Sequence, residues 1–205
     1  NEIREKIIKK AENCEIVCIS KNHPKESVIT AIKAGVRIFG ENRVMEAKDK
    51  FEDLKQTIPD IQLHLTGPLQ SNKIKHAIKI FDVFHTLDRE KIAREFSKHH
   101  AALNNKQFYI QVNTGKEKSK SGIFPEDIQN FLKLCQEDLK LNISGLMCIP
   151  PIQDKPSFHF NLLKKLANEN NLSELSIGMS GDYEEALEYN PKYIRLGTIL
   201  FGKRK

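Results

Sequence analysis

The chain has 205 residues, of which 39% are hydrophobic and 29% charged, and 33 basic against 27 acidic side chains leave a formal net charge of +6. This composition is too apolar for a disordered chain, and no apolar run approaches the roughly 20 residues that cross a bilayer, so we expect no membrane span. The basic excess suits a phosphate ligand, but scattered lysines, 7% aromatic residues and no Trp argue against a nucleic-acid partner.

Short apolar runs alternate with longer charged segments along the chain. Many of the runs are rich in β-branched residues, as strands are, and the segments between them have apolar residues at helical spacing. The runs that we expect to be strands are residues 16–20, 36–40, 61–66, 83–87, 108–113, 143–148, 175–177 and 193–196. Helix-start signals stand at Pro24, at Asp88 as a cap, at Pro125 and at Asp182.

This alternation predicts parallel strands joined by right-handed helical crossovers. Eight units of about 26 residues suit a compact (β/α)8 barrel, and an open, doubly wound sheet is the alternative. No linker or shift in composition divides the chain, so we expect a single domain over residues 1–205. Function in such a barrel gathers where strands end and the following loops begin.

Lys21 closely follows the first expected strand. Partial desolvation at the barrel mouth lowers the pKa of a lysine and frees its amine for Schiff-base chemistry. The plain alternative is a surface lysine that starts a loop.

The last two expected strands lead into glycine-containing loops. Ile177 to Asp182 (IGMSGD) passes from strand to helix through two glycines, and Gly197-Thr198 repeats the arrangement at the next strand end. Loops after strands seven and eight often bind phosphate in barrels, although two ordinary glycine turns would look the same. Arg195 lies within the last strand, where an inward side chain needs a ring nitrogen, a phosphate or a carboxylate as partner. An outward arginine lying over a helix is equally compatible with the pattern.

Other chemistry finds little support in the sequence. His64 and His85 lie on different expected elements, and neither H-x3-H nor HExxH occurs, so we expect no metal. The P-loop, GxGxxG and GxSxG motifs are absent as well. Four cysteines without a CxxC pair favour a reducing, cytoplasmic setting.

Six blocks spread over residues 19 to 202 carry a resemblance to a known family. They are ISK at 19–21, FGEN at 39–42, HLTGPLQSNK at 64–73, SKSG at 119–122, GLM at 145–147, and GMS at 178–180 paired with RLGT at 195–198 and FG at 201–202. On these blocks the chain resembles the pyridoxal 5'-phosphate (PLP) homeostasis proteins, the YggS/PROSC family. That family has the fold of the N-terminal barrel of alanine racemase.

The resemblance implies a set of cofactor contacts. Lys21 is expected to form the internal aldimine with PLP, and Arg195 to face the pyridine nitrogen. Ser180, Gly197 and Thr198 would bind the phosphate. The remaining contacts that it implies are Asn42, beside the cofactor, and Met179, in the phosphate loop. One departure is Arg43, which stands where many members have an aromatic residue.

The expected site favours a carrier over an enzyme, and we expect no catalytic residue. A cation opposite the pyridine nitrogen disfavours its protonation and makes the ring a poorer electron sink. The racemases take a second acid/base from a separate domain, which we expect to be absent because the sequence reaches Lys205 soon after the last block. We therefore expect a monomeric protein of PLP (vitamin B6) homeostasis with little or no catalysis and PLP-dependent apoenzymes as partners. The alternative is a fold-type III PLP enzyme such as an amino-acid racemase.

Overall fold

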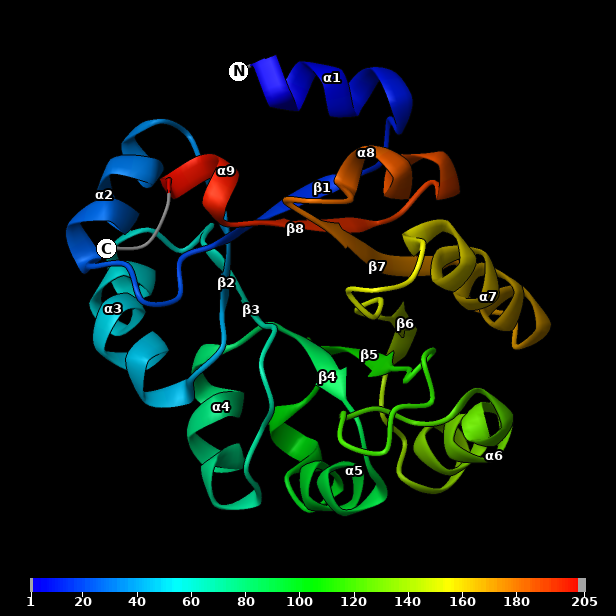
Figure 1. Ribbon diagram of the computed structural model, residues 1–205. Coiled ribbons are helices and arrows are strands. Elements are labelled where there is room, and N and C mark those ends of the chain that lie inside the picture. Colours follow the sequence, from blue (N-terminus) through cyan, green and yellow to red (C-terminus); the bar gives the residue numbers. More distant parts are fainter. Residues whose placement is uncertain (1, 203–205) are drawn as a thin grey trace.

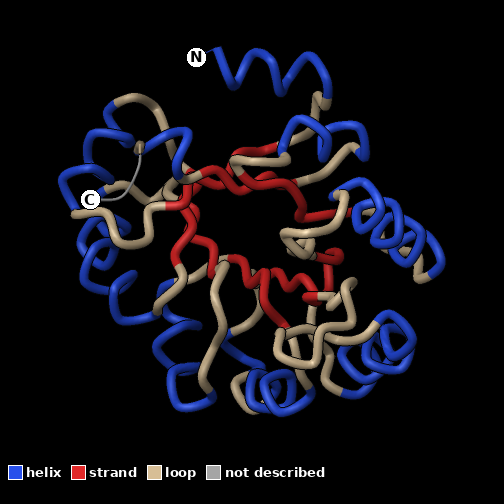
Figure 2. Tube along the Cα trace, viewed as in Figure 1, coloured by secondary structure: helices blue, strands red, loops and turns tan. Residues whose placement is uncertain are grey.

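In the computed structural model, residues 2–202 form a closed barrel of eight parallel strands surrounded by helices (Figures 1 and 2). Asn1 and residues 203–205 of the expected domain lie outside the described residues. Each strand pairs with its neighbours in the sequence, and β8 closes the barrel against β1. The strands are β1 (Glu15–Ile19), β2 (Ile38–Glu41), β3 (Gln62–Leu65), β4 (Val83–Leu87), β5 (Gln107–Gln111), β6 (Ile143–Met147), β7 (Glu174–Met179) and β8 (Tyr193–Leu196).

A helix follows every strand, and the helices form a ring outside the barrel (Figure 2). A π-helical turn (Leu134–Asp138) continues α6, and short 3-10 turns lie at Ser71–Lys73, His100–Ala102, Pro125–Asp127 and Leu187–Tyr189. The helices are α1 (Glu2–Lys10), α2 (Lys25–Lys33), α3 (Val44–Thr57), α4 (Ile74–Ile80), α5 (Glu90–Ser97), α6 (Ile128–Lys133), α7 (Pro156–Glu169), α8 (Tyr183–Ala186) and α9 (Thr198–Phe201).

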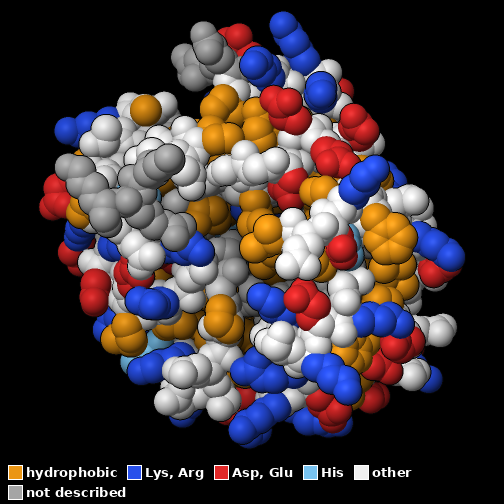
Figure 3. Space-filling model, viewed as in Figure 1, with side chains coloured by type: hydrophobic (Ala, Val, Ile, Leu, Met, Phe, Trp, Pro, Cys, Tyr) orange, Lys and Arg blue, Asp and Glu red, His pale blue; other side chains and the backbone are white. Residues whose placement is uncertain are grey.

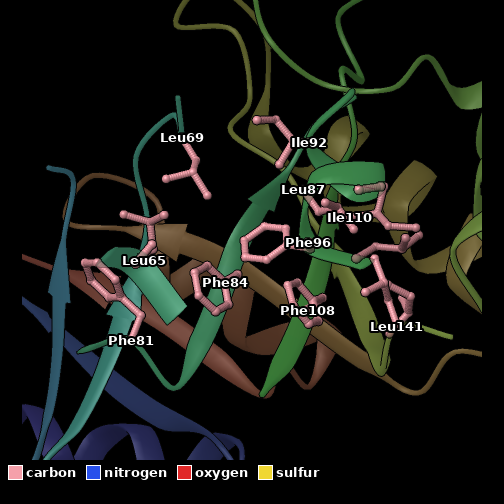
Figure 4. Packing of buried hydrophobic residues seen from close by; sticks show 14 of the residues in the cluster. Leu65, Leu69, Phe81, Phe84, Leu87, Ile92, Phe96, Phe108, Ile110 and Leu141 are labelled. Carbon is pink, nitrogen blue, oxygen red and sulfur yellow. The ribbon is translucent and has the colours of Figure 1, made fainter. Parts of the chain in front are cut away.

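The main hydrophobic core lies between the strands and the helices (Figure 4). Phe84 of β4, Phe96 of α5 and Phe108 of β5 meet there, with ring centroids 4.8 to 5.1 Å apart. All three rings are buried. Burying one such side chain contributes about 1.5–3 kcal/mol, so this layer fixes the helices on the outside of the barrel.

A second, smaller cluster fills the inside of the barrel. Alternate residues of a strand point to opposite faces, and this cluster takes the residues that the outer core leaves. The aromatic ring of Tyr109 occupies space beside Gly145, where an added Cβ would lie 2.9 Å from that ring. The buried members of the cluster are Val17, Ile19, Val83, Tyr109, Met147 and Tyr193.

The structure confirms the eight expected strands and the (β/α)8 barrel, and it excludes the open, doubly wound sheet. The expectation of Asp88 as a helix cap is wrong by one residue. Arg89 precedes α5 instead, and the carboxylate of Asp88 is buried in an ion pair with Arg89 at 2.5 Å. Within residues 2–202, no helix is long and apolar enough to cross a membrane.

Candidate functional site

The seven expected cofactor contacts gather at one end of the barrel, on or just after four neighbouring strands. The strands β7, β8, β1 and β2 lie side by side, as the pairs Met179–Arg195, Cys18–Leu196 and Ile19–Gly40 show. Figure 1 looks onto the end from which the loops after the strands emerge. The residues brought to this end are Lys21, Asn42, Met179, Ser180, Arg195, Gly197 and Thr198.

The turn that carries Lys21 is held on both sides. The N–H of Ser20 donates to the carbonyl of Gly40 at 3.0 Å, and the N–H of Asn22 donates to Glu46 Oε1 at 2.6 Å. Asn22 adopts a left-handed conformation (φ 61°), which asparagine tolerates better than most residues. The half-buried Lys21 therefore projects from a turn with a defined geometry.

A cluster of charged and polar side chains holds this turn in place. Lys50 of α3 donates to the carbonyl of Ser20 and to Glu41 Oε1, both at 2.8 Å, and its Nζ lies 2.7 Å from Glu46 Oε1. The hydroxyl of Ser20 donates to Glu41 Oε1 at 2.7 Å. These four residues, Ser20, Glu41, Glu46 and Lys50, are called the Lys50 cluster below.

Charge is concentrated in the Lys50 cluster. Glu41 is completely buried, and burial raises the pKa of its carboxyl, although hydrogen bonds from Lys50 and Ser20 oppose the shift. Glu46 is more exposed. Its partial burial raises its pKa, but the hydrogen bonds from Lys50 and the Asn22 N–H outweigh burial, and the net pKa is lowered. Lys50 is thus the cation that makes the buried Glu41 carboxylate tolerable.

Arg195 points into the barrel, as one of the two interpretations of the sequence expected. Its Nη1 donates to the carbonyl and to the hydroxyl of Ser176, both at 2.7 Å, and its Nη2 donates to the carbonyl of Cys148 at 2.9 Å. The side chain is only 5% exposed, and burial lowers the pKa of its guanidinium. Neutral acceptors hold this cation near the mouth.

The glycine-containing loops after β7 and β8 present backbone N–H groups to the same end. Gly178 has a φ of +86°, and a Cβ there would lie 2.7 Å from Ala186 Cβ, so glycine allows the sharp entry into α8. Nothing lies within 4 Å of a Cβ added to Gly181, so that backbone is open. The short helix α9 begins directly after Gly197, and the first N–H groups of a helix have no intrahelical acceptor. These donors suit an anion.

Asn42 is fixed by the loop that follows β3. Thr66 Oγ1 donates to Asn42 Oδ1 at 2.9 Å. Gly67 passes so close that a Cβ there would lie 2.5 Å from the carbonyl oxygen of Asn42. Arg43, the departure from the family pattern, is exposed and immediately precedes α3. The structure therefore orients Asn42 without help from an aromatic neighbour.

Around this end, Lys and Arg side chains are scattered among Asp and Glu rather than gathered in one stripe (Figure 3). No group of three or more His, Cys, Asp or Glu side chains within residues 2–202 is placed to hold a metal ion. Reasoning from the sequence missed Glu46 and Lys50. The available signal was their spacing of four residues on one helix, which brings opposite charges together.

Comparisons with known proteins show which proteins this chain is similar to. The family model described as alanine racemase, N-terminal domain, matches residues 1–205. A pyridoxal phosphate homeostasis protein of Aquifex aeolicus is 36% identical over 208 residues, covering 96% of this chain and 90% of that protein. One of Vibrio cholerae is 38% identical over 201 residues, covering 93% and 85%.

Solved structures agree with these matches. PipY of Synechococcus elongatus, without PLP, superposes with a TM-score of 0.88 at 32% identity, covering 98% of this chain and 99% of that one. The same protein with PLP bound gives a TM-score of 0.80 at 32% identity, with 93% of each chain covered. An alanine racemase of Acinetobacter baumannii shares the fold at 17% identity, with a TM-score of 0.74, covering 97% of this chain and 59% of that one.

Proposed function

Because the chain belongs to the alanine racemase N-terminal domain family, and within it to the pyridoxal phosphate homeostasis proteins, we propose that it binds PLP covalently through Lys21. It serves the homeostasis of this cofactor inside the cell. The observation that carries the proposal is the turn of Lys21, which the Lys50 cluster holds beside the loops after β7 and β8. PipY, a relative of nearly the same length, has been solved with PLP bound.

The donor set of the site fits each part of PLP. When bound, the cofactor would supply an aldehyde, and Lys21 is the residue whose amine would hold it covalently. Ser180, Gly197 and Thr198 would hold the phosphate through the N–H groups and hydroxyls of their loops. A Cβ on Gly197 would lie 3.4 Å from the carbonyl oxygen of Ile19, which is an ordinary contact and places the loop after β8 beside the end of β1. Met179 ends β7 and directly precedes Ser180 in the other of the two loops.

The other side chains orient the ring. Arg195, held by Ser176 inside the barrel, would face the pyridine nitrogen, and Asn42, held by Thr66 at the end of β2, would lie beside the cofactor. An arginine keeps the pyridine nitrogen unprotonated, which makes the ring a weak electron sink. We therefore propose that the protein has little or no catalytic activity and passes PLP to PLP-dependent apoenzymes. The name of its relatives, homeostasis proteins, supports this role.

We propose that the protein binds PLP in the cytoplasm. The four cysteines, Cys14, Cys18, Cys135 and Cys148, are free, buried thiols in the described part of the chain. Free thiols in general suit a reducing compartment such as the cytoplasm.

The test is the absorbance spectrum of purified, dialysed protein before and after borohydride, followed by peptide mapping. We expect a visible band that borohydride bleaches and a reduced adduct on Lys21. Lys21→Ala should lose the band. Lys25→Ala is the matched control, because Lys25 lies four residues further on and forms only a surface ion pair with Asp53 at 3.3 Å. A wild-type protein that stays colourless after addition of PLP, or an adduct retained by Lys21→Ala, contradicts the proposal.

Deuterium exchange separates the carrier from a racemase. The loaded protein is incubated in D2O with a panel of amino acids, and exchange at each α-carbon is followed by NMR. A carrier gives no exchange above the rate of free PLP. Protein-dependent exchange that Lys21→Ala abolishes would identify an enzyme instead.

A further inference from the structure

A chain of hydrogen bonds crosses the inside of the barrel behind Arg195. Arg195 Nη1 lies 2.7 Å from Ser176 Oγ, and Ser176 Oγ lies 2.7 Å from His85 Nδ1. His85 Nε2 lies 2.8 Å from His64 Nδ1, and His64 Nε2 lies 3.0 Å from Gln62 Oε1. These five residues, on β8, β7, β4 and β3, are called the interior relay.

The middle of the interior relay is buried, whereas Gln62 at its far end is half-buried. His64, His85 and Ser176 are completely buried. Tyr109 stacks on His85 with ring centroids 5.0 Å apart, and Tyr193 meets His64 edge-on at 4.8 Å. Burial lowers the pKa of His64 to about 3, and burial together with the charges of His64 and Arg195 holds that of His85 well below its usual range. Both rings are therefore neutral at physiological pH, each with one N–H and one acceptor nitrogen.

The direction of the relay follows from its two ends. A guanidinium only donates, and a carbonyl oxygen such as Gln62 Oε1 only accepts. His64 must therefore donate from Nε2 and accept at Nδ1, and His85 must donate from Nε2 and accept at Nδ1. The hydroxyl of Ser176 then donates to His85, and its lone pairs remain for Arg195.

We propose that His85 and His64 are positioning residues, which turn the hydroxyl of Ser176 so that it accepts from Arg195 and thereby fix the guanidinium toward the pyridine nitrogen. This inference rests on the proposed function. Acceptors within residues 2–202 account for three of the five N–H donors of Arg195, and the remaining two are available to a ligand. Without an acceptor at His85, Ser176 can turn its hydrogen toward Arg195, and the guanidinium loses its anchor.

Two substitutions of His85 separate positioning from mere packing. In His85→Asn, the side-chain oxygen replaces Nδ1 and still accepts from Ser176. In His85→Leu, the volume is kept and the acceptor is lost. Tyr109→Phe is the control, because it keeps the ring stacked on His85 and removes only the hydroxyl, which donates to Glu174 outside the interior relay. Thermal unfolding of each variant reports the loss of packing separately.

The readout on the loaded protein is the 15N NMR shift of PLP labelled at its pyridine nitrogen, together with the affinity for PLP. We expect His85→Leu to move the shift and to weaken affinity by roughly tenfold, the value of one hydrogen bond to a charged group. His85→Asn and Tyr109→Phe should keep the wild-type shift, whatever their melting temperatures. A wild-type shift and affinity in His85→Leu would overturn the inference.

A second readout needs no cofactor. The 15N shifts of His64 and His85 in the unliganded protein give their tautomers, and we expect N–H at Nε2 in both rings from pH 5 to pH 8. The N–H of His85 at Nδ1, or titration of either ring in that range, would overturn the inference. If the wild-type protein does not bind labelled PLP, the proposed function is refuted. The tautomers of His64 and His85 still test the direction of the hydrogen bonds in the interior relay, because they are measured without PLP.

Discussion

The Lys50 cluster makes a sharp prediction about stability. Lys50→Met keeps the length of the side chain and removes the cation that contacts Ser20, Glu41 and Glu46. Glu46 can turn to solvent, but Glu41 is completely buried and would remain without an opposite charge. Breaking a buried ion pair from one side costs about 3–5 kcal/mol. We expect Lys50→Met to lower the free energy of unfolding by this amount at pH 7.

The pH dependence of the free energy of unfolding gives an independent magnitude for this loss of stability. Burial raises the pKa of Glu41 above its ordinary value of 4.5, so the folded state binds the proton more tightly than the unfolded state. Stability is therefore lost as pH rises from that value through the folded pKa. Without Lys50 the folded pKa rises further. Each pH unit across this window costs about 1.4 kcal/mol, so the window from 4.5 to 7 accounts for about 3.4 kcal/mol at most.

The assay is urea unfolding of wild type, Lys50→Met, Glu41→Gln and the double variant at pH 4.5 and pH 7. The deficit of Lys50→Met should be small at pH 4.5 and large at pH 7, and Glu41→Gln in the same chain should restore much of it. A deficit below about 1 kcal/mol at pH 7, or one that does not depend on pH, would refute the account of Glu41 as a buried carboxylate neutralised by Lys50.

Two further predictions concern close contacts and buried thiols. Gly67→Ala places a Cβ 2.5 Å from the carbonyl oxygen of Asn42. We expect this variant to be about 1–3 kcal/mol less stable in urea unfolding and to bind PLP more weakly in a spectral titration. An unchanged unfolding midpoint would contradict this prediction. Burial raises the pKa of the thiols of Cys14, Cys18, Cys135 and Cys148 from 9.0 to about 12. Alkylation of the native protein by iodoacetamide at pH 8, followed by mass spectrometry, should therefore be at least about a thousandfold slower than alkylation in urea. Fast labelling of the native protein would contradict this prediction.

The barrel is predictable from the sequence because each strand is a local signal. The largely apolar runs at 83–87 and 193–196 match β4 and β8 residue for residue, since Asp82 and Asp88 bound the first run and Lys192 and Gly197 bound the second. The run at 175–177 covers only the middle of β7. Gly178 interrupts the apolar pattern there, yet its positive φ lets the chain stay in the sheet and then turn into α8.

The side chains that support the site are harder to predict, because their partners are distant in sequence. His85 and Ser176 are 91 residues apart, and only closure of the barrel brings them together. The available signal was polar residues at inward positions of strands, His64 in the middle of QLHL and His85 in the middle of VFHTL. Such residues need partners when buried, and two on adjacent strands are natural partners for each other.

The pairing of β8 with β1 joins the last strand of the barrel to the first, and the candidate site lies across that pair. The other strand pairs unite neighbours in the sequence, whereas this one closes a loop of some 170 to 180 residues between Ile19 and Tyr193, the step with the largest entropic cost. Lys21 stands on one side of it and Thr198 on the other. A ligand held by both would therefore bind only after both strands have been synthesised and paired, and it would slow the opening of the barrel at this contact.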